Sequence, residues 1–175
     1  MTFRRIAIVG PESTGKSLLS KELADHFQTV WVEEYAREFL HRLDREYNQA
    51  NLIDIANGQL ALEEERANEA NSFLFCDTNL LVIKVWSEFV FGEVDPWLVE
   101  NMQLDSYTLH LLTDIDLPWE EDPLREHPHR RKELFDIYQK ELFSAGVPFE
   151  IVRGQGPDRL ASALKALEAH SLVSA

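Results

Sequence analysis

The sequence predicts an α/β fold, a three-layer sandwich in which helices cover both faces of a parallel five-stranded sheet. Short apolar runs alternate along the chain with longer, helix-like segments, the pattern of right-handed strand–helix–strand units. A glycine-containing turn follows the first apolar run directly, and polar residues follow most of the others. In a parallel sheet such residues gather at the carboxyl ends of the strands, where ligands bind.

Apolar spacing and helix-stop residues predict the individual elements. Strands are expected at the short apolar runs, residues 3–9, 29–32, 73–76, 107–112 and 149–152. Helices are expected where the pattern lengthens and apolar residues recur on one side, at 17–27, 36–46, 53–70, 80–91, 96–102, 130–145 and 157–170. Gly146 and Pro148 end the helix that begins at residue 130, because neither continues a helix.

Residues 10–17, Gly-Pro-Glu-Ser-Thr-Gly-Lys-Ser, match the P-loop pattern Gly-x-x-x-x-Gly-Lys-Ser between a strand and a helix. The glycines let the backbone curl and point N–H groups at phosphate oxygens, and the following helix adds its positive end. Lys16 is expected at the β- and γ-phosphates, and Ser17 at Mg²⁺. The motif predicts a P-loop NTPase fold. Its ATP-binding residues are expected to be Gly10, Glu12, Ser13, Thr14, Gly15, Lys16, Ser17 and Leu18.

Composition limits the classes of partner. The 175 residues include 31 acidic and 17 basic side chains, a formal net charge of −14, which argues against nucleic acid and anionic membranes. A small nucleoside substrate stays compatible, because phosphate capture is local. The single cysteine, with no apparent leader or transmembrane-length run, favours a cytoplasmic protein with one domain over residues 1–175. Composition does not indicate an oligomeric state.

Asp77 ends the apolar run 73–76, the position of a Walker B carboxylate. There it is expected to hold Mg²⁺, directly or through water, or to orient an acceptor hydroxyl. The alternative is an aspartate that only caps the next turn. The P-loop favours the functional interpretation.

A second polar cluster, Glu33-Glu34-Tyr35-Ala36-Arg37, follows the second predicted strand. These side chains suit a polyol such as ribose, and a carboxylate among them is a candidate general base. The alternative is a solvated helix start, where acidic residues are favourable. Glu34 is expected to point inward, and whether Glu34 or Asp77 orients the acceptor hydroxyl stays open.

The polar, proline-containing stretch at about 114–130 is expected to form a lid over the site. Arginine suits the charge of a phosphoryl group in transfer, so Arg125 is expected to be catalytic. Arg130 and Arg131 begin a helix, where cations are unfavourable unless an anion compensates. ATP phosphates or the neighbouring glutamates of the loop, at 120 and 121, are the candidate anions.

The sequence leaves open which aromatic residue stacks on the base and where Gln59 points. A nucleobase needs a flat partner, and the candidates are Trp31, Tyr35, Trp86 and Trp119. Gln59, on the long helix predicted at 53–70, faces either the substrate cleft or solvent.

The motifs occur in the order seen in one known family. The P-loop, residues 34–38 (Glu-Tyr-Ala-Arg-Glu), 75–78 (Phe-Cys-Asp-Thr) and 118–125 (Pro-Trp-Glu-Glu-Asp-Pro-Leu-Arg) resemble the kinase domain of NadR-type proteins over nearly the whole chain. That domain is a ribosylnicotinamide kinase, which uses ATP to convert nicotinamide riboside to nicotinamide mononucleotide in NAD salvage. The resemblance implies ATP and Mg²⁺ as cofactors and Lys16, Asp77 and Arg125 as catalytic residues. The implied substrate-binding residues are Glu34, Tyr35, Arg37, Asp77, Trp119 and Asp122.

The sequence therefore predicts a P-loop kinase for a ribonucleoside, most favourably nicotinamide riboside. The alternatives are another small-molecule, nucleoside or nucleotide kinase and a regulatory P-loop ATPase. A GTPase should carry the strings Asn-Lys-x-Asp and Asp-x-x-Gly, and neither occurs. An AAA+ motor should place Glu directly after the Walker B aspartate, where this chain has Thr78.

Overall fold

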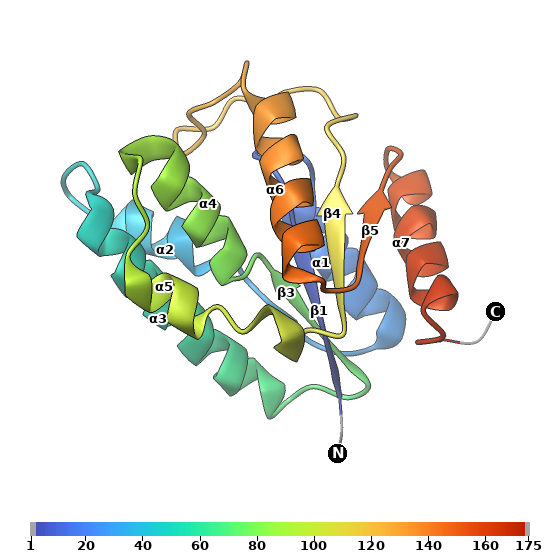
Figure 1. Cartoon of the computed structure of the whole chain (residues 1–175). Helices are drawn as coiled ribbons and strands as arrows, with labels where there is room; N and C mark the ends of the chain where they lie inside the picture. Colours follow the sequence, from blue (N-terminus) through green and yellow to red (C-terminus); the bar gives the residue numbers. More distant parts are fainter. Residues whose placement is uncertain (1–2, 174–175) are drawn as a thin grey trace.

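One parallel sheet organises the molecule (Figure 1). The structure is a computed structural model that describes residues 3–173, so residues 1–2 and 174–175 of the expected domain lie outside the described residues. The spatial order of the strands is β2-β3-β1-β4-β5, with all neighbours parallel. Their bounds are β1 Arg4–Val9, β2 Trp31–Val32, β3 Phe73–Asp77, β4 Leu109–Thr113 and β5 Phe149–Val152. The predicted α/β fold with a parallel five-stranded sheet is confirmed.

Helices cover both faces of this sheet (Figure 1). On one face lie α1 (Lys16–Phe27) and α7 (Pro157–Ala169). The opposite face is covered by α3 (Gln49–Ala67), α4 (Leu80–Phe91) and α6 (Arg131–Ala145). Two shorter helices, α2 (Tyr35–Arg42) and α5 (Pro96–Asn101), pack on α3 and α4, and a 3₁₀ turn, Leu104–Ser106, precedes β4.

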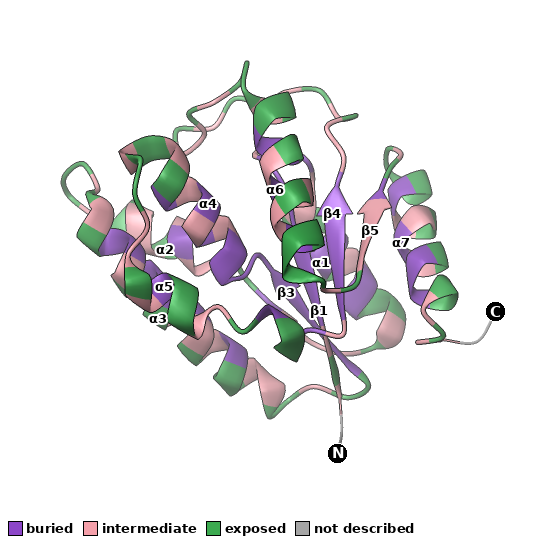
Figure 2. Ribbon diagram, viewed as in Figure 1, coloured by how far each residue is buried: buried purple, intermediate pink, exposed green. Residues whose placement is uncertain are grey.

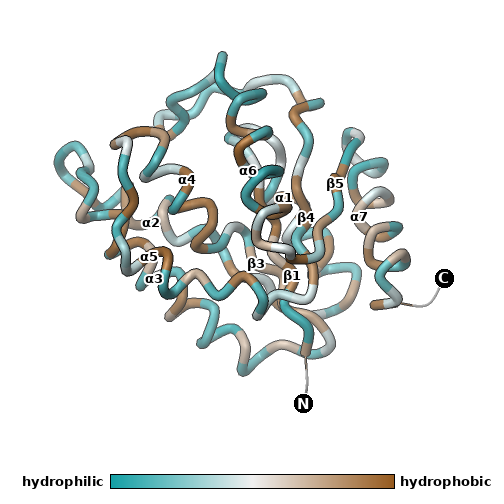
Figure 3. Tube along the Cα trace, viewed as in Figure 1, coloured by the Kyte–Doolittle hydropathy of each residue, from teal (hydrophilic) through white to brown (hydrophobic). Residues whose placement is uncertain are grey.

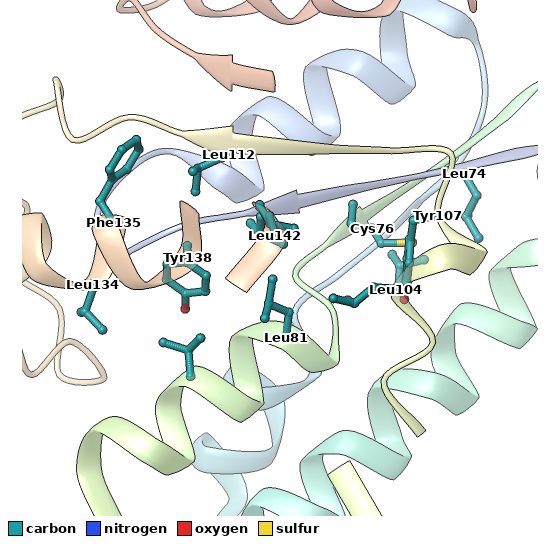
Figure 4. Close-up of a cluster of buried hydrophobic side chains, with 14 residues drawn as sticks. Leu74, Cys76, Leu81, Leu104, Tyr107, Leu112, Leu134, Phe135, Tyr138 and Leu142 are labelled. Atoms are coloured by element: carbon teal, nitrogen blue, oxygen red, sulfur yellow. The ribbon is translucent and has the colours of Figure 1, made fainter. Parts of the chain in front are cut away.

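Alternate strand residues supply the cores on the two sides of the sheet. Ile6 and Ile8 of β1 pack with α1 and α7, whereas Ala7 and Val9 pack with α4 and α6, as the two-residue period of a strand requires. Figure 2 shows β3, β4 and most of β1 buried, β5 largely of intermediate exposure, and the outward helix faces exposed. Figure 4 shows the core between the sheet, α4 and α6, with Tyr138 of α6 among its members. This core borders the functional site described below.

Polar residues dominate the outer surface of the helices and the connecting loops (Figure 3). Apolar residues concentrate at the strands and on the helix faces turned toward them (Figure 3). None of the helices within residues 3–173 combines the length and the apolar character needed to cross a bilayer.

Several element boundaries differ from those predicted. The helix predicted from residue 53 begins at Gln49, because Asn48 and Asn51 form a reciprocal capping box at its start. The strand predicted at 29–32 is shorter, because the Thr29 amide instead donates to the Ala24 carbonyl (2.9 Å) behind α1. Hydrogen bonds at the ends of helices thus determine where a helix or strand begins, which apolar spacing alone does not show.

The carboxyl ends of β3, β1 and β4 lie next to one another. Ile8 of β1 is in register with Asp77 of β3, and Val9 is in register with Leu112 of β4. Gly10 follows Val9 with φ +140°, and a Cβ on it would lie 2.5 Å from the Thr113 hydroxyl oxygen. Only glycine allows this approach, which brings the P-loop against the end of β4.

Candidate active site

The P-loop wraps around the start of α1, as its motif predicts. Gly15 has φ +75° and precedes the first helical residue, Lys16. The Thr14 hydroxyl donates to the Pro11 carbonyl (2.7 Å) and pairs with the Thr113 hydroxyl (2.7 Å). Lys16 Nζ also donates to the Pro11 carbonyl (2.8 Å). The loop is therefore held in its curved form by its own hydrogen bonds, with the amides of the helix start at its centre.

The side chains of Glu12 and Ser13 bind the lid, whereas the motif led us to expect them at ATP. The Glu12 carboxylate accepts hydrogen bonds from the amides of Glu126 (3.2 Å) and His127 (3.0 Å). The Ser13 hydroxyl accepts one from the Glu120 amide (2.9 Å). These two variable positions of the motif connect the P-loop to the segment above it. The expectation that these two residues bind ATP stays a prediction.

The predicted lid segment contains no helix or strand between β4 and α6, and it lies across the P-loop. Arg125 approaches the Ser13 hydroxyl (3.4 Å) and donates to the Glu120 carbonyl. Asp122 forms an ion pair with Arg37 of α2 (2.9 Å). The amide of Leu124 and the Arg37 guanidinium hold the pKa of Asp122 below its usual range. The lid is thus fastened to α2 as well as to the P-loop.

Arg130 and Arg131 have partners within the chain, and neither forms an ion pair with the expected Glu120 or Glu121. Arg130 pairs with Glu133 one turn along α6 (2.7 Å) and lies over the Phe89 ring. Arg131 donates to the carbonyls of Ser13 (3.2 Å) and Leu117 (2.9 Å). Both charges are therefore compensated within the chain, by a helix carboxylate and by backbone carbonyls.

Asp77 lies at the phosphate end of the site and is 1% exposed. Neither of its carboxylate oxygens has a hydrogen-bond partner among the described residues. Burial and the nearby Glu34 carboxylate raise its pKa to about 7, against the opposing effect of Lys16 and Ser17. Buried carboxylates normally have donors, so this side chain is prepared for a group that the protein itself does not supply.

The residue after Asp77 has an unusual backbone. Thr78 has φ +70° and is 2% exposed, a conformation that β-branched residues rarely adopt. Its amide donates to the Ile8 carbonyl (3.0 Å). Strain of this kind occurs preferentially at functional sites, and here it turns the chain sharply after the carboxylate.

The predicted metal ligands fit Mg²⁺ chemically. The Ser17 hydroxyl lies close enough to the Asp77 carboxylate to lower its pKa, and no side chain of the described residues forms a hydrogen bond of good geometry with the carboxylate. Among the described residues no group of three or more His, Cys, Asp or Glu side chains is arranged to hold a metal. Mg²⁺ commonly uses one or two protein oxygens and completes its shell with water and phosphate, so a two-ligand set is compatible with it.

The expected substrate residues separate into two groups. Glu34 and Arg37 line a cavity of about 570 Å³ that begins at the P-loop, whereas the adjacent Glu33 is exposed. The other four expected residues, Tyr35, Asp77, Trp119 and Asp122, do not line it. The Tyr35 ring packs so closely on α3 that a Cβ at Gly58 would lie 2.0 Å from it. The Trp119 ring lies 5.8 Å from the Arg131 guanidinium, on the lid.

Gln59 fits neither of its two predicted environments, because it is 1% exposed and lies outside the cavity lining. Its side-chain oxygen accepts from the Tyr35 amide (2.9 Å), and its amide group donates to the Glu33 carbonyl (3.4 Å). Gln59 therefore supports the segment that carries Glu34. Sequence spacing could not reveal this role, because the two partners are backbone groups on another element.

The far end of the cavity is aromatic, and most of its residues were not predicted. Of the four candidates for a base-stacking residue, Trp86 alone lines the cavity. Its indole N–H donates to the Tyr47 hydroxyl (3.1 Å), which donates to the Glu126 carboxylate of the lid (2.8 Å). Burial raises the pKa of Tyr47 to about 12. Phe89 and Tyr138 also line the cavity.

Comparisons relate this site to known proteins. The sequence profile of a family described as AAA domain matches residues 5–159. The "Trifunctional NAD biosynthesis/regulator protein NadR" of Salmonella typhimurium is 27% identical over 128 residues, which are 70% of this chain and 31% of that protein. The Escherichia coli protein of the same name has the same identity and coverage. The chain thus spans less than a third of these relatives' length.

Two solved structures of NadR share the fold. NadR in complex with NR has a TM-score of 0.83 at 21% identity, covering 98% of this chain and 52% of that one. NadR in complex with NAD and AMP-PNP has a TM-score of 0.80 at 21% identity, covering 99% of this chain and 51% of that one. At this identity the structures establish the fold alone. With the sequence matches, they confirm the expected resemblance to NadR-type proteins.

Proposed function

The chain belongs to this AAA-domain family, and from that premise we propose that it is a P-loop kinase that transfers the γ-phosphoryl group of ATP to a ribonucleoside. Nicotinamide riboside is the acceptor we favour. The observation that carries the proposal is Asp77, a buried carboxylate close to Lys16 and Ser17 of the P-loop, whose oxygens have no hydrogen bond of good geometry among the described residues. Asp77 does not itself line the cavity, whose wall the P-loop and Glu34 share. A Mg²⁺-bound nucleotide phosphate and the hydroxyl of an acceptor would supply the missing partners of the Asp77 carboxylate.

The phosphate end of the cavity carries the chemistry in this proposal. The backbone N–H groups of residues 12–17, which include the start of α1, receive the phosphates, and Lys16 moves from the Pro11 carbonyl to them. Ser17 and Asp77 would hold Mg²⁺, which would neutralise charge on the phosphate oxygens. Asp77 or Glu34 accepts the proton of the attacking hydroxyl, whose oxygen bonds to the γ-phosphorus as ADP leaves.

The lid, residues 114–130, supplies the second catalytic contribution. Arg125 lies beside Ser13 of the P-loop, within reach of a transferred phosphoryl group whose negative charge it would stabilise. The Arg37–Asp122 pair and the Glu12 contacts keep the segment over the cavity. Closure of this kind excludes water and limits wasteful hydrolysis of ATP.

The acceptor end favours a flat, cationic base. Trp86, Tyr47 and Phe89 offer aromatic surfaces, and carboxylates of Glu34, Glu46 and Glu126 lie among the lining residues. The pyridinium ring of nicotinamide riboside carries a positive charge, which aromatic faces and carboxylates attract. The NR complex of the NadR structure supports the same choice.

A panel assay tests the proposal. ATP consumption is measured with nicotinamide riboside, other ribonucleosides, thymidine, shikimate and buffer alone, and the product is identified by mass. We expect nicotinamide riboside to give the highest kcat/KM and a folded Lys16→Ala protein to give no transfer. ATP turnover that no acceptor increases would favour a regulatory ATPase. Preference for another acceptor would favour a different small-molecule kinase.

A further inference from the structure

Tyr138 of α6 is a buried phenol that opens into the cavity. The residue is 4% exposed and lines the cavity together with Glu34 and the P-loop. Figure 4 shows its ring standing between α6 and α4, with the hydroxyl oxygen directed away from Leu112 and the sheet. Sequence reasoning did not identify this residue, because its spacing on α6 is that of a core position.

The Tyr138 hydroxyl has no hydrogen bond to any residue in the described part of the chain. Tyr107, in the same apolar core, shows the usual arrangement, since its hydroxyl lies 2.8 and 2.9 Å from the two oxygens of Glu63. A buried tyrosine hydroxyl normally finds such a partner. The Tyr138 hydroxyl is not among the buried unpaired atoms of the described residues, so it is accessible from the cavity, where a bound molecule can be its partner.

Charge around Tyr138 specifies the chemistry of that ligand. Burial and the carboxylates of Glu34 and Glu12 raise the pKa of the phenol well above its usual range, so it remains a hydrogen-bond donor. Glu12 is already engaged by two lid amides, whereas Glu34 faces the same cavity as an acceptor. A group that accepts from Tyr138 and donates to Glu34 satisfies both, and an alcohol does so with a single oxygen.

We propose that Tyr138 is a specificity-determining residue whose hydroxyl binds the 2′,3′-diol of the acceptor's ribose, opposite Glu34. This inference rests on the proposed nucleoside kinase activity and adds a residue to its acceptor site. The aromatic end takes the base and the P-loop end takes the 5′-hydroxyl, so the diol falls along the wall between them, to which Tyr138 and Glu34 belong.

The test compares Tyr138→Phe with Tyr107→Phe, the same chemical change in the same core but outside the cavity. For Tyr138→Phe we expect an increase of about fivefold in the KM and Kd of the ribonucleoside, the effect of one hydrogen bond. The KM for ATP should stay within about twofold. Tyr107→Phe should leave both KM values unchanged, and thermal unfolding confirms that both variants are folded.

Acceptor analogues separate a direct contact from a structural effect. The effect of Tyr138→Phe should disappear with either the 2′-deoxy or the 3′-deoxy nucleoside, because the contacted oxygen is then missing from the ligand. An equal increase for all acceptors, or an equal increase in the KM for ATP, would overturn the inference. Failure of the proposed function itself is distinct, because the wild-type protein would then phosphorylate none of these nucleosides.

Discussion

Two buried carboxyl groups next to strand β3 have the same raised pKa and opposite surroundings. Asp77 and Glu63 are 1% and 4% exposed, and burial raises the pKa of each to about 7. Glu63, which reaches the strand from α3, is hydrogen-bonded by Tyr107 through both oxygens. Asp77 has no partner among the described residues and lies beside the P-loop.

The difference teaches that a perturbed pKa does not by itself identify a functional site. Burial alone raises the pKa of any carboxyl group, whether or not it takes part in chemistry. The distinguishing features are oxygens without a donor of good geometry and proximity to Lys16 and Ser17 of the P-loop, which Asp77 has and Glu63 lacks. The two tyrosines form a parallel contrast, since Tyr107 is satisfied within the core and Tyr138 opens into the cavity.

The largest effect is expected on kcat, when the carboxyl group of Asp77 is replaced and the result is compared with the same change at Glu63. Asp77→Asn keeps the shape of the side chain but removes its charge and basicity, so kcat should fall by about a thousandfold in the acceptor assay. Glu63→Gln makes the same chemical change in the core and should retain the wild-type kcat. If Asp77→Asn stays within tenfold of wild type, Asp77 is a structural residue like Glu63.

The second prediction concerns stability and pH. The pKa of Glu63 is about 7 in the folded protein and about 4.5 for an ordinary glutamate. As the pH rises, Glu63 therefore loses its proton in the unfolded chain before it does so in the folded protein. Stability should therefore be lost between pH 4.5 and 7, by about 3 kcal/mol in total. Burial causes the shift, while Tyr107, Arg5 and Cys76 oppose it.

Glu63→Gln isolates this contribution, because every other titrating group is common to both proteins. Denaturant unfolding should find the variant no more stable than wild type near pH 4.5 and more stable above pH 7. A stability difference that is the same at both pH values would show that Glu63 is not protonated preferentially in the folded protein.

The third prediction concerns the partner of Glu63. Tyr107→Phe removes the hydroxyl that lies near both carboxylate oxygens and leaves a buried acid unsatisfied, which should cost about 2 kcal/mol of unfolding free energy. Urea unfolding of the variant measures the loss. A loss below about 0.5 kcal/mol would indicate that solvent reaches Glu63 in the folded protein.

The smallest effect is expected at a carboxylate that is both paired and accessible. Asp122 and Arg37 have side chains that are 20% and 42% exposed, and such pairs contribute at most about 1 kcal/mol. Asp122→Asn should change stability by no more than that and kcat by less than tenfold. A loss comparable to that of Asp77→Asn would support the substrate-binding role that the resemblance implies for Asp122.

The features that were predictable from the sequence are those whose geometry is local. The P-loop could be identified because eight consecutive residues between a strand and a helix determine its backbone path. The end position of Asp77 follows from the length of one apolar run, and the sheet from the alternation of strands and helices. Tyr35 and Trp119 show the limit, since their motif was recognised while their rings lie outside the cavity.

The sequence by itself determined the fold class, the phosphate-binding loop and the strand end that carries Asp77, because each depends on residues that are neighbours in the chain. Only the tertiary structure decided that Gln59 supports Glu34, that Glu12 binds the lid, and that Trp86 and Tyr138 wall the cavity. Those contacts join elements far apart in sequence. The direction of each side chain follows from how its helix packs, which the apolar pattern leaves undetermined because a cavity wall and a core show the same spacing.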